Sequence, residues 1–274
     1  MRQFVTFVFS PILSLFSPSF YKSLPKRSVG EGFLYLFYLA VWGAFVLMLM
    51  ISLRWLPAVD EFVDWFSYQT PTFTFNEGRI TTNVKEPYAV THPTLGTLLI
   101  VNTKKKEIKP EDLQNVYFYV TSHVIYASDP IRNETRMFDL GAQAHRTGNQ
   151  LHGPQSLDGQ MIRQIYQTIK PLVSVIFFFV IVFLVFVWKM TAALLYSVAA
   201  LLLNRFREEK FSYATLLNFS CFSLTAVFIL QLANIVFFNL QMPVPLWLSF
   251  AVTVFYLIFG ILFVLPPERT RTIP

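Results

Sequence analysis

Four histidines have the widest chemical range of any side chains in this chain, because imidazole can transfer protons or bind a metal ion near neutral pH. They are His92, His123, His145 and His152. Their spacing matches no zinc-binding motif, and the sequence HExxH is absent. We therefore interpret them as surface or loop histidines, and the sequence predicts no metal site and no cofactor.

A second combination that could do chemistry is the pair Ser122-His123, followed by Asp129 and Asp139. The pair falls on a predicted strand, where neighbouring side chains point to opposite faces, which argues against a serine–histidine dyad. The chain also lacks the GxSxG, P-loop and GxGxxG motifs. We expect a protein that is not an enzyme. A membrane-embedded enzyme that uses His123 with Asp129 or Asp139 is the alternative.

The composition is typical of a membrane protein. Hydrophobic residues make up 54% of the 274 residues, charged residues make up 14%, and phenylalanine occurs 30 times. Cys221 is the only cysteine and lies in an apolar segment, so the chain cannot form an intrachain disulfide or a cysteine-based zinc or iron–sulfur site.

The net charge of +6 is unevenly distributed. Residues 57–170 contain 11 basic and 12 acidic side chains, whereas the rest of the chain contains 11 and 4. The excess positive charge therefore lies beside hydrophobic segments, which is the pattern of membrane topology and not of nucleic-acid binding. We expect the lipid bilayer as a partner and no nucleic acid.

Four apolar segments are long enough to be transmembrane helices, which need about twenty residues. Arg54 and Trp55 close the first segment and are predicted to anchor it at the membrane interface. In the third segment, Gln231 and Asn234 share one helical face, and we expect them to hydrogen-bond to another helix. The four segments are residues 32–56, 171–205, 212–240 and 246–265.

The second segment exceeds the length of one span, and two arrangements are open. In the favoured one, a single span ends near Lys189, whose side chain extends to the cytoplasmic interface, and the helix continues as a cytoplasmic extension. In the other, the chain turns at residues 188–190 and crosses back. The second arrangement needs two very short spans and has no turn residues.

The sequence pattern of residues 57–170 predicts an inserted β-rich domain. Residues 57–66 predict a short amphipathic helix. Alternating segments on either side of residues 76–78 then predict two strands and a turn, and residues 116–126 predict one long strand or two. Residues 156–169 predict a helix with Ser156 as its N-cap.

The expected fold class is thus a membrane α-helical protein with four transmembrane helices and an inserted extracytoplasmic β-rich (α+β) domain. The positive-inside rule places both termini in the cytoplasm. The predicted cytoplasmic parts are an interfacial N-terminal segment, a loop and a tail, and a short turn joins the last two helices outside. These are residues 1–31, 206–211, 266–274 and 241–245 in that order.

Residues 16–41, FSPSFYKSLPKRSVGEGFLYLFYLAV, resemble the opening of a bacterial membrane family catalogued as domain of unknown function 1189. Residues 71–78, PTFTFNEG, and residues 86–88, EPY, are similar to recurring pieces of that family. Residues 99–103, LIVNT, stand where members tend to carry Ile-Asp-Thr, so Asn102 here replaces an acid. On this resemblance Asn102 and Thr103 are candidate binding residues.

Some members of that family are labelled maltodextrin-utilisation proteins, and the resemblance therefore implies an association with transport. The leading hypothesis is a non-enzymatic protein of the bacterial cytoplasmic (inner) membrane whose external domain binds a ligand or a partner. A transporter, or an accessory subunit of a sugar transport system, is the alternative. The sequence leaves open whether another membrane protein or a second copy of the chain is the partner.

Overall fold

The computed structural model describes residues 8–76, 78–105, 108–113, 115–129, 134–140, 155–238 and 244–262. The chain divides into two compact units. The helical unit contains Met1–Leu56 and Val173–Pro274, and the mixed unit contains Pro57–Leu172. Helices and two β-sheets are both present, so the protein has a mixed fold.

Among its described residues, the helical unit contains three helices that are long and apolar enough to cross a membrane, and these indicate a membrane protein. They are α4 (Val29–Arg54), the part of α7 (Gly159–Asn204) that lies in this unit, and α8 (Tyr213–Phe238). The fourth predicted span corresponds to α9 (Leu246–Leu262), which is apolar but has 17 residues. Such a helix is about 26 Å long against a hydrocarbon core of about 30 Å. The four-span arrangement stays a prediction.

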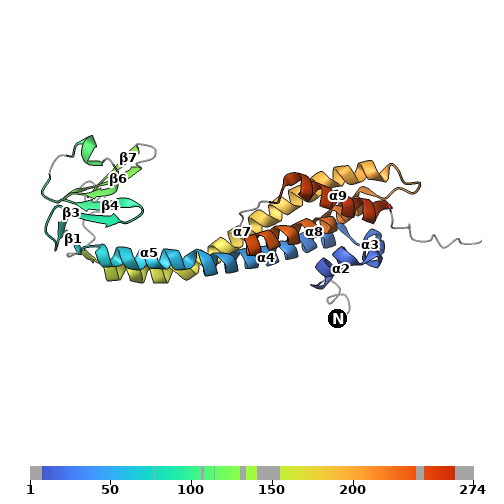
Figure 1. Cartoon of the computed structure of the whole chain (residues 1–274), viewed down its shortest axis with the longest axis horizontal. Helices are drawn as coiled ribbons and strands as arrows, with labels where there is room; N and C mark the ends of the chain where they lie inside the picture. The colour runs from blue at the N-terminus through green and yellow to red at the C-terminus, as the bar shows by residue number, and fades with distance from the viewer. Residues whose placement is uncertain are drawn as a thin grey trace, which may run out of the picture. The chain divides into compact units, whose positions relative to one another are not determined.

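Three short elements precede α4 and pack against the long helices. These are α2 (Ser10–Phe16), α3 (Pro18–Ser23) and the 3-10 helix η1 (Leu24–Lys26), which lie beside α8 in the helical unit (Figure 1). Ser28 then begins α4 with a capping box, in which its hydroxyl accepts from the Glu31 N–H and Glu31 accepts from the Ser28 N–H. The start of α4 is therefore fixed by the sequence itself.

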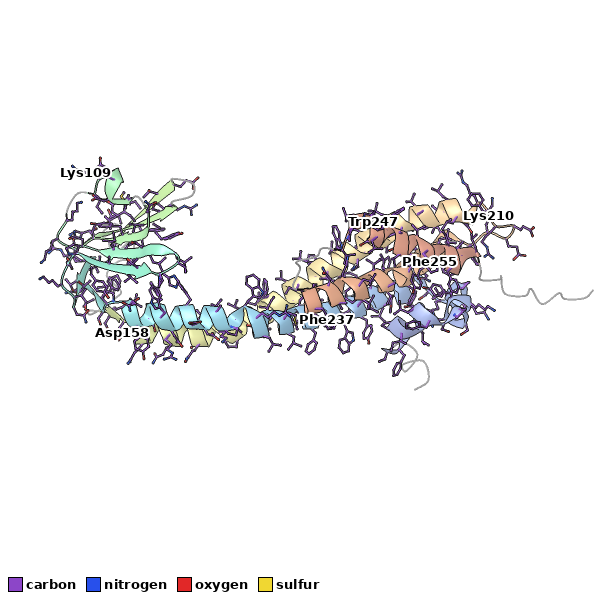
Figure 2. The ribbon with its side chains drawn as sticks, in the orientation of Figure 1. Lys109, Asp158, Lys210, Phe237, Trp247 and Phe255 are labelled. Atoms are coloured by element: carbon purple, nitrogen blue, oxygen red, sulfur yellow. The ribbon has the colours of Figure 1, made fainter. Side chains whose placement is uncertain are left out.

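The core of the helical unit forms around α8. Tyr35 of α4 stacks on Phe222 with ring centroids 4.3 Å apart, and Phe219 packs in the same cluster as Leu257 of α9. Apolar side chains also cover the outside, as Phe237, Trp247 and Phe255 illustrate (Figure 2). An apolar interior with an apolar exterior is what a helix bundle in lipid requires.

The middle of α4 approaches α8 closely at Gly43. A Cβ at this position would lie 2.8 Å from the Phe228 ring and 3.9 Å from Val185 of α7. Gly43 therefore lets three helices meet at one level, close to the midpoint of α4.

Helix α7 is continuous from Gly159 to Asn204 and contains Pro171. The alternative with a turn at residues 188–190 is therefore wrong, and residues 171–205 lie on one helix up to Asn204. The prediction of Ser156 as an N-cap is also wrong, because Ser156 lies in strand β8 (Gln155–Leu157). Asp158 has that role, since its Oδ1 accepts from the Met161 N–H at 2.8 Å.

The mixed unit begins with α5 (Leu56–Gln69), the amphipathic helix that the sequence predicts, and continues into two sheets. The smaller sheet has the order β2-β1-β8, and the larger has the order β3-β4-β5-β6-β7 with β4 and β5 parallel. The remaining strands are β1 (Phe73–Asn76), β2 (Arg79–Thr82), β3 (Tyr88–His92), β4 (Gly96–Val101), β5 (Val116–Val120), β6 (Val124–Asp129) and β7 (Glu134–Asp139). The 3-10 helix η2 (Pro110–Leu113) stands between β4 and β5.

The structure confirms the β1–β2 hairpin and divides residues 116–126 between β5 and the start of β6, which pair side by side as antiparallel strands. Ser122 and His123 are in the turn between these strands, so their predicted strand position is wrong. The core of this unit contains Phe73, Ile80 and Leu99, which join the two sheets.

Helix α5 and the first turns of α7 lie side by side within the mixed unit (Figure 1). Asp60 accepts hydrogen bonds from Lys170 Nζ at 2.7 and 2.8 Å and from the Tyr166 hydroxyl at 2.6 Å. The bonds from Lys170 and Tyr166 hold the pKa of Asp60 below its usual value. Burial and the bond to Asp60 raise the pKa of Tyr166 to about 12.

Because its folded pKa is depressed, Asp60 stabilises the protein fully above its unfolded pKa of about 3.9, and this contribution is lost as the pH falls through the folded value. Asp60→Asn should therefore lower the unfolding temperature at pH 7. The difference from wild type should shrink below about pH 4. Thermal unfolding between neutral and acidic pH measures this, with Glu61→Gln on the exposed face of α5 as the charge-matched control. A difference that stays constant with pH would contradict it.

Candidate functional site

Lys189 is the one charged side chain that the described part of the helical unit buries almost completely, with 4% of its surface exposed. Its Nζ donates a 2.7 Å hydrogen bond to Oε1 of Gln231 on α8 and lies 5.2 Å from the centroid of the Phe228 ring. Helix α7 thus contacts α8 through the ammonium group of Lys189, which meets the amide of Gln231 and the ring of Phe228.

The ammonium group lies near the middle of the helical unit and not at its end. Phe228 is the ring that contacts Gly43, close to the midpoint of α4, and the same ring faces Lys189 Nζ. The sequence placed Lys189 at the cytoplasmic interface with an extended side chain. The structure instead turns it inward, where the side chain is buried and its Nζ meets the Gln231 side chain of α8.

The apolar segments contain no carboxylate that could form an ion pair with Lys189. Residues 32–53, 172–204, 213–238 and 246–262 contain no Asp or Glu. The hydrogen bond to Gln231 and the face of Phe228 are therefore the favourable contacts available for an ammonium group in a medium of low polarity. Ionisable side chains placed in this way in membrane proteins mark functional sites more often than surface charges do.

Gln231 and Asn234 were both predicted to bond to a neighbouring helix. Gln231 does so through Lys189, and Asn234 follows it by three residues on the same face of α8 and is buried. The structure gives no hydrogen bond that would assign a partner to the Asn234 side chain among the described residues, so that half of the prediction stays open.

Arg54 and Trp55, the other two of the three predicted interface anchors, occupy exposed positions at the end of α4. Arg54 donates a 2.8 Å hydrogen bond from Nη2 to the carbonyl oxygen of Val236, in the last turn of α8. A helix C-terminus carries unpaired carbonyl groups and a partial negative charge, so an arginine is a favourable partner there. Trp55 is 65% exposed. Their contact with lipid headgroups stays a prediction.

In the mixed unit, the predicted binding residue Thr103 is engaged by Glu86. The Thr103 N–H donates to Oε2 at 2.8 Å, its hydroxyl lies 2.8 and 2.9 Å from the two carboxylate oxygens, and the Thr82 hydroxyl donates to Oε1 at 2.8 Å. Partial burial raises the pKa of Glu86, but the bonds from Thr103 and Thr82 outweigh it and leave the pKa below its usual value.

Asn102 is half-buried, and its backbone N–H donates to the carbonyl oxygen of Val120 at 2.9 Å. The backbone of Asn102 thus extends the pairing of β4 with β5, and Glu86 is held beside it by Thr103. Glu86 belongs to the family-like segment 86–88, but no function was predicted for its side chain from the sequence. The signal in the sequence was Thr82, four residues before Glu86, since a threonine hydroxyl can donate to a carboxylate.

Of the two histidines that the structure describes, His92 contributes to a local turn and His123 contacts a distant one. His92 Nδ1 lies 3.0 Å from the Thr94 hydroxyl and 3.2 Å from the Thr94 N–H, and His123 Nδ1 lies 3.3 Å from the carbonyl oxygen of Gly78. His145 and His152 lie outside the described residues. Within the part of the chain that the structure describes, no three His, Cys, Asp or Glu side chains gather in a way that could hold a metal ion.

The family model described as Protein of unknown function (DUF1189) matches residues 11–261. The chain belongs to this family. No curated protein and no solved structure matches it. The DUF1189 match extends from α2 to α9 and therefore covers both the Lys189–Gln231 pair and the Glu86–Thr103 cluster.

Breaking the Lys189–Gln231 pair from its two ends should have unequal effects. Gln231→Leu leaves a buried ammonium group without its acceptor and should cost roughly 3 kcal/mol of stability. Lys189→Met leaves only a neutral amide unpaired and should cost about 1 kcal/mol. The double variant should recover most of the stability, because both polar groups are gone.

The measurement is a double-mutant cycle on the unfolding free energy of the full chain in detergent micelles. Thr191→Ala, on the exposed face of the same helix, is the control. A Gln231→Leu variant as stable as wild type would show that the ammonium group gains nothing from this hydrogen bond.

Proposed function

We propose that this chain is a non-enzymatic integral protein of the bacterial cytoplasmic membrane that crosses the bilayer four times. In this proposal the mixed unit, Pro57–Leu172, lies outside the cytoplasm and binds a protein partner. The three membrane-length helices, the apolar α9 and the distribution of basic residues support the membrane part. The larger sheet supports the binding part.

The observation that carries the binding proposal is the exposure of β7. All six residues of this strand, Glu134–Asp139, are exposed, and its only sheet partner among the described strands is β6. Met137 and Phe138 are adjacent, so they present apolar side chains on both faces of the sheet. An edge strand with exposed apolar side chains is a template for the addition of a partner strand.

The face that carries Phe138 continues the core. Phe138 pairs with Ile125, and Ile125 pairs with the buried Val120. Phe118, two residues before Val120, shares this face and is also exposed. The apolar surface therefore extends from Phe118 to Phe138, and a partner strand at β7 would contact Phe138 at its edge.

The binding test places a photocrosslinking amino acid at Phe138 and, in a matched variant, at Thr91 on β3, the opposite edge of the same sheet. Irradiated cells should yield a covalent adduct with another protein from position 138 and not from position 91. Adducts from neither position, with both variants present at wild-type levels, would remove the basis of the binding proposal.

The topology is tested separately with single cysteines in a Cys221→Ser background. A membrane-impermeant maleimide should label Thr91→Cys in intact spheroplasts, and should label Glu208→Cys only after the membrane is opened. The reverse result would place the mixed unit in the cytoplasm.

A second candidate function is an accessory role in the transport of a sugar, and the Lys189–Gln231 pair is the observation that favours it. A buried cation in the middle of a helix bundle is a feature of transport pathways. Lys189→Met should then reduce maltodextrin uptake several-fold at wild-type protein levels, whereas Thr191→Ala should not. Equal uptake by both variants would count against this function.

A further inference from the structure

The short helix α2 has its polar and apolar faces reversed relative to a helix on a protein surface in water. Ser10 and Ser14 are 0% and 1% exposed, and they face the interior of the helical unit. Phe9, Ile12 and Phe16 are 52%, 56% and 79% exposed. An outward apolar face with inward serines is favourable only where the surroundings are themselves apolar.

The inward groups of α2 are satisfied within the protein. The Ser14 hydroxyl donates to the carbonyl oxygen of Pro11 at 2.9 Å, and the Tyr21 hydroxyl donates to the Ser14 carbonyl oxygen at 2.9 Å. The inward hydroxyl and carbonyl groups of Ser14 therefore need no water. This is the condition for a short helix to lie in hydrocarbon.

The depth of α2 follows from its contacts with two longer helices. At its start, the Tyr38 hydroxyl donates to the carbonyl oxygen of Val8 at 3.2 Å. Tyr38 stands ten residues beyond the Ser28 cap of α4, or about 15 Å along the helix axis. Its side chain leans back toward the N-terminus, which places Val8 on the order of 10 Å inside the span.

The end of α2 lies at a similar depth, measured from α9. The Tyr256 hydroxyl donates to the carbonyl oxygen of Leu15 at 3.4 Å. Tyr256 stands six residues before Leu262, or about 9 Å along the axis. Both ends of α2 therefore lie on the order of 10 Å or more inside the apolar segments.

The segment after α2 returns to the surface of the bundle. Tyr21 of α3 packs against Gly260, near the end of α9, where a Cβ would lie 2.8 Å from the tyrosine ring. Lys22 and Lys26 follow and are exposed. Basic side chains just above an apolar helix match the phosphate level of a lipid leaflet.

We propose that α2 is immersed in the acyl-chain layer of the leaflet nearest Lys22 and Lys26, with Phe9, Ile12 and Phe16 in contact with lipid tails. Lipid, and not a protein partner, is the occupant because the exposed face of α2 continues onto a candidate span. Tyr38, which binds Val8, also contacts Trp42, and Trp42 is half-exposed on the outer face of α4. A position in the acyl-chain layer is deeper than the interfacial position predicted for residues 1–31 from the sequence. It does not depend on what the mixed unit binds.

The test measures depth in the full chain, reconstituted in vesicles of phosphatidylethanolamine and phosphatidylglycerol. Nitroxide labels are attached to single cysteines at Ile12, Phe16 and Lys26, with the buried Cys221 either kept or replaced by alanine. Collisions with dissolved oxygen report the hydrocarbon layer, and collisions with a water-soluble nickel chelate report water. Labels at 12 and 16 should show high oxygen and low nickel accessibility, whereas the label at 26 should show the opposite.

Two results would overturn the proposal. Nickel accessibility at 12 and 16 equal to that at 26 would place α2 in water or at the headgroups. Low accessibility to both reagents would mean that a protein surface covers the helix. Agreement between the two Cys221 backgrounds confirms that the labelled chains are folded alike.

Discussion

The helical unit is organised by the requirement that each polar group removed from water find its partner inside the protein. In an apolar environment an unpaired hydroxyl or amide costs several kcal/mol, more than the net gain of an ordinary hydrogen bond in water. The serines of α8 meet this requirement locally, since Ser220 and Ser223 donate to the carbonyl oxygens one turn earlier. Thr225 meets it between helices, with the Tyr35 hydroxyl 2.5 Å away. Lys189, a charged group, meets it by donating a hydrogen bond to Gln231.

Among the residues that the structure describes, one buried side-chain atom does not meet this requirement. Asn218 donates from its amide to the carbonyl oxygens of Arg27 and Ser28, which fastens α8 to the start of α4, while its Oδ1 is buried without a partner. A Cβ on Gly32 would lie 2.5 Å from this oxygen. Gly32 thus leaves space for the Asn218 amide. The two hydrogen bonds that Asn218 donates offset the cost of its unpaired Oδ1.

Features that depend on neighbouring residues could be predicted from the sequence, and features that depend on contacts between distant segments could not. Hydrophobic length located α4 and α8, and the Asn76 to Gly78 turn located the β1–β2 hairpin. The partner of Lys189 is 42 residues away, so nothing in the pattern around Lys189 shows that its side chain turns inward. Ser156 failed as an N-cap because β8 pairs with β1, a contact that no local propensity contains. In the mixed unit, the threonines around Glu86 were visible, but their convergence on one carboxylate depends on where β3 and β4 place the chain.

The position of α8 in the chain has a consequence for how the protein is made. The partners of its polar groups are Arg27 and Ser28 for Asn218, Tyr35 for Thr225, Lys189 for Gln231 and Arg54 for the Val236 carbonyl group. All of them precede Tyr213, so the ribosome has synthesised each of them before α8 emerges. The most polar of the three long helices therefore enters a bilayer in which its acceptors and donors are already present, and it need not cross lipid as an isolated segment.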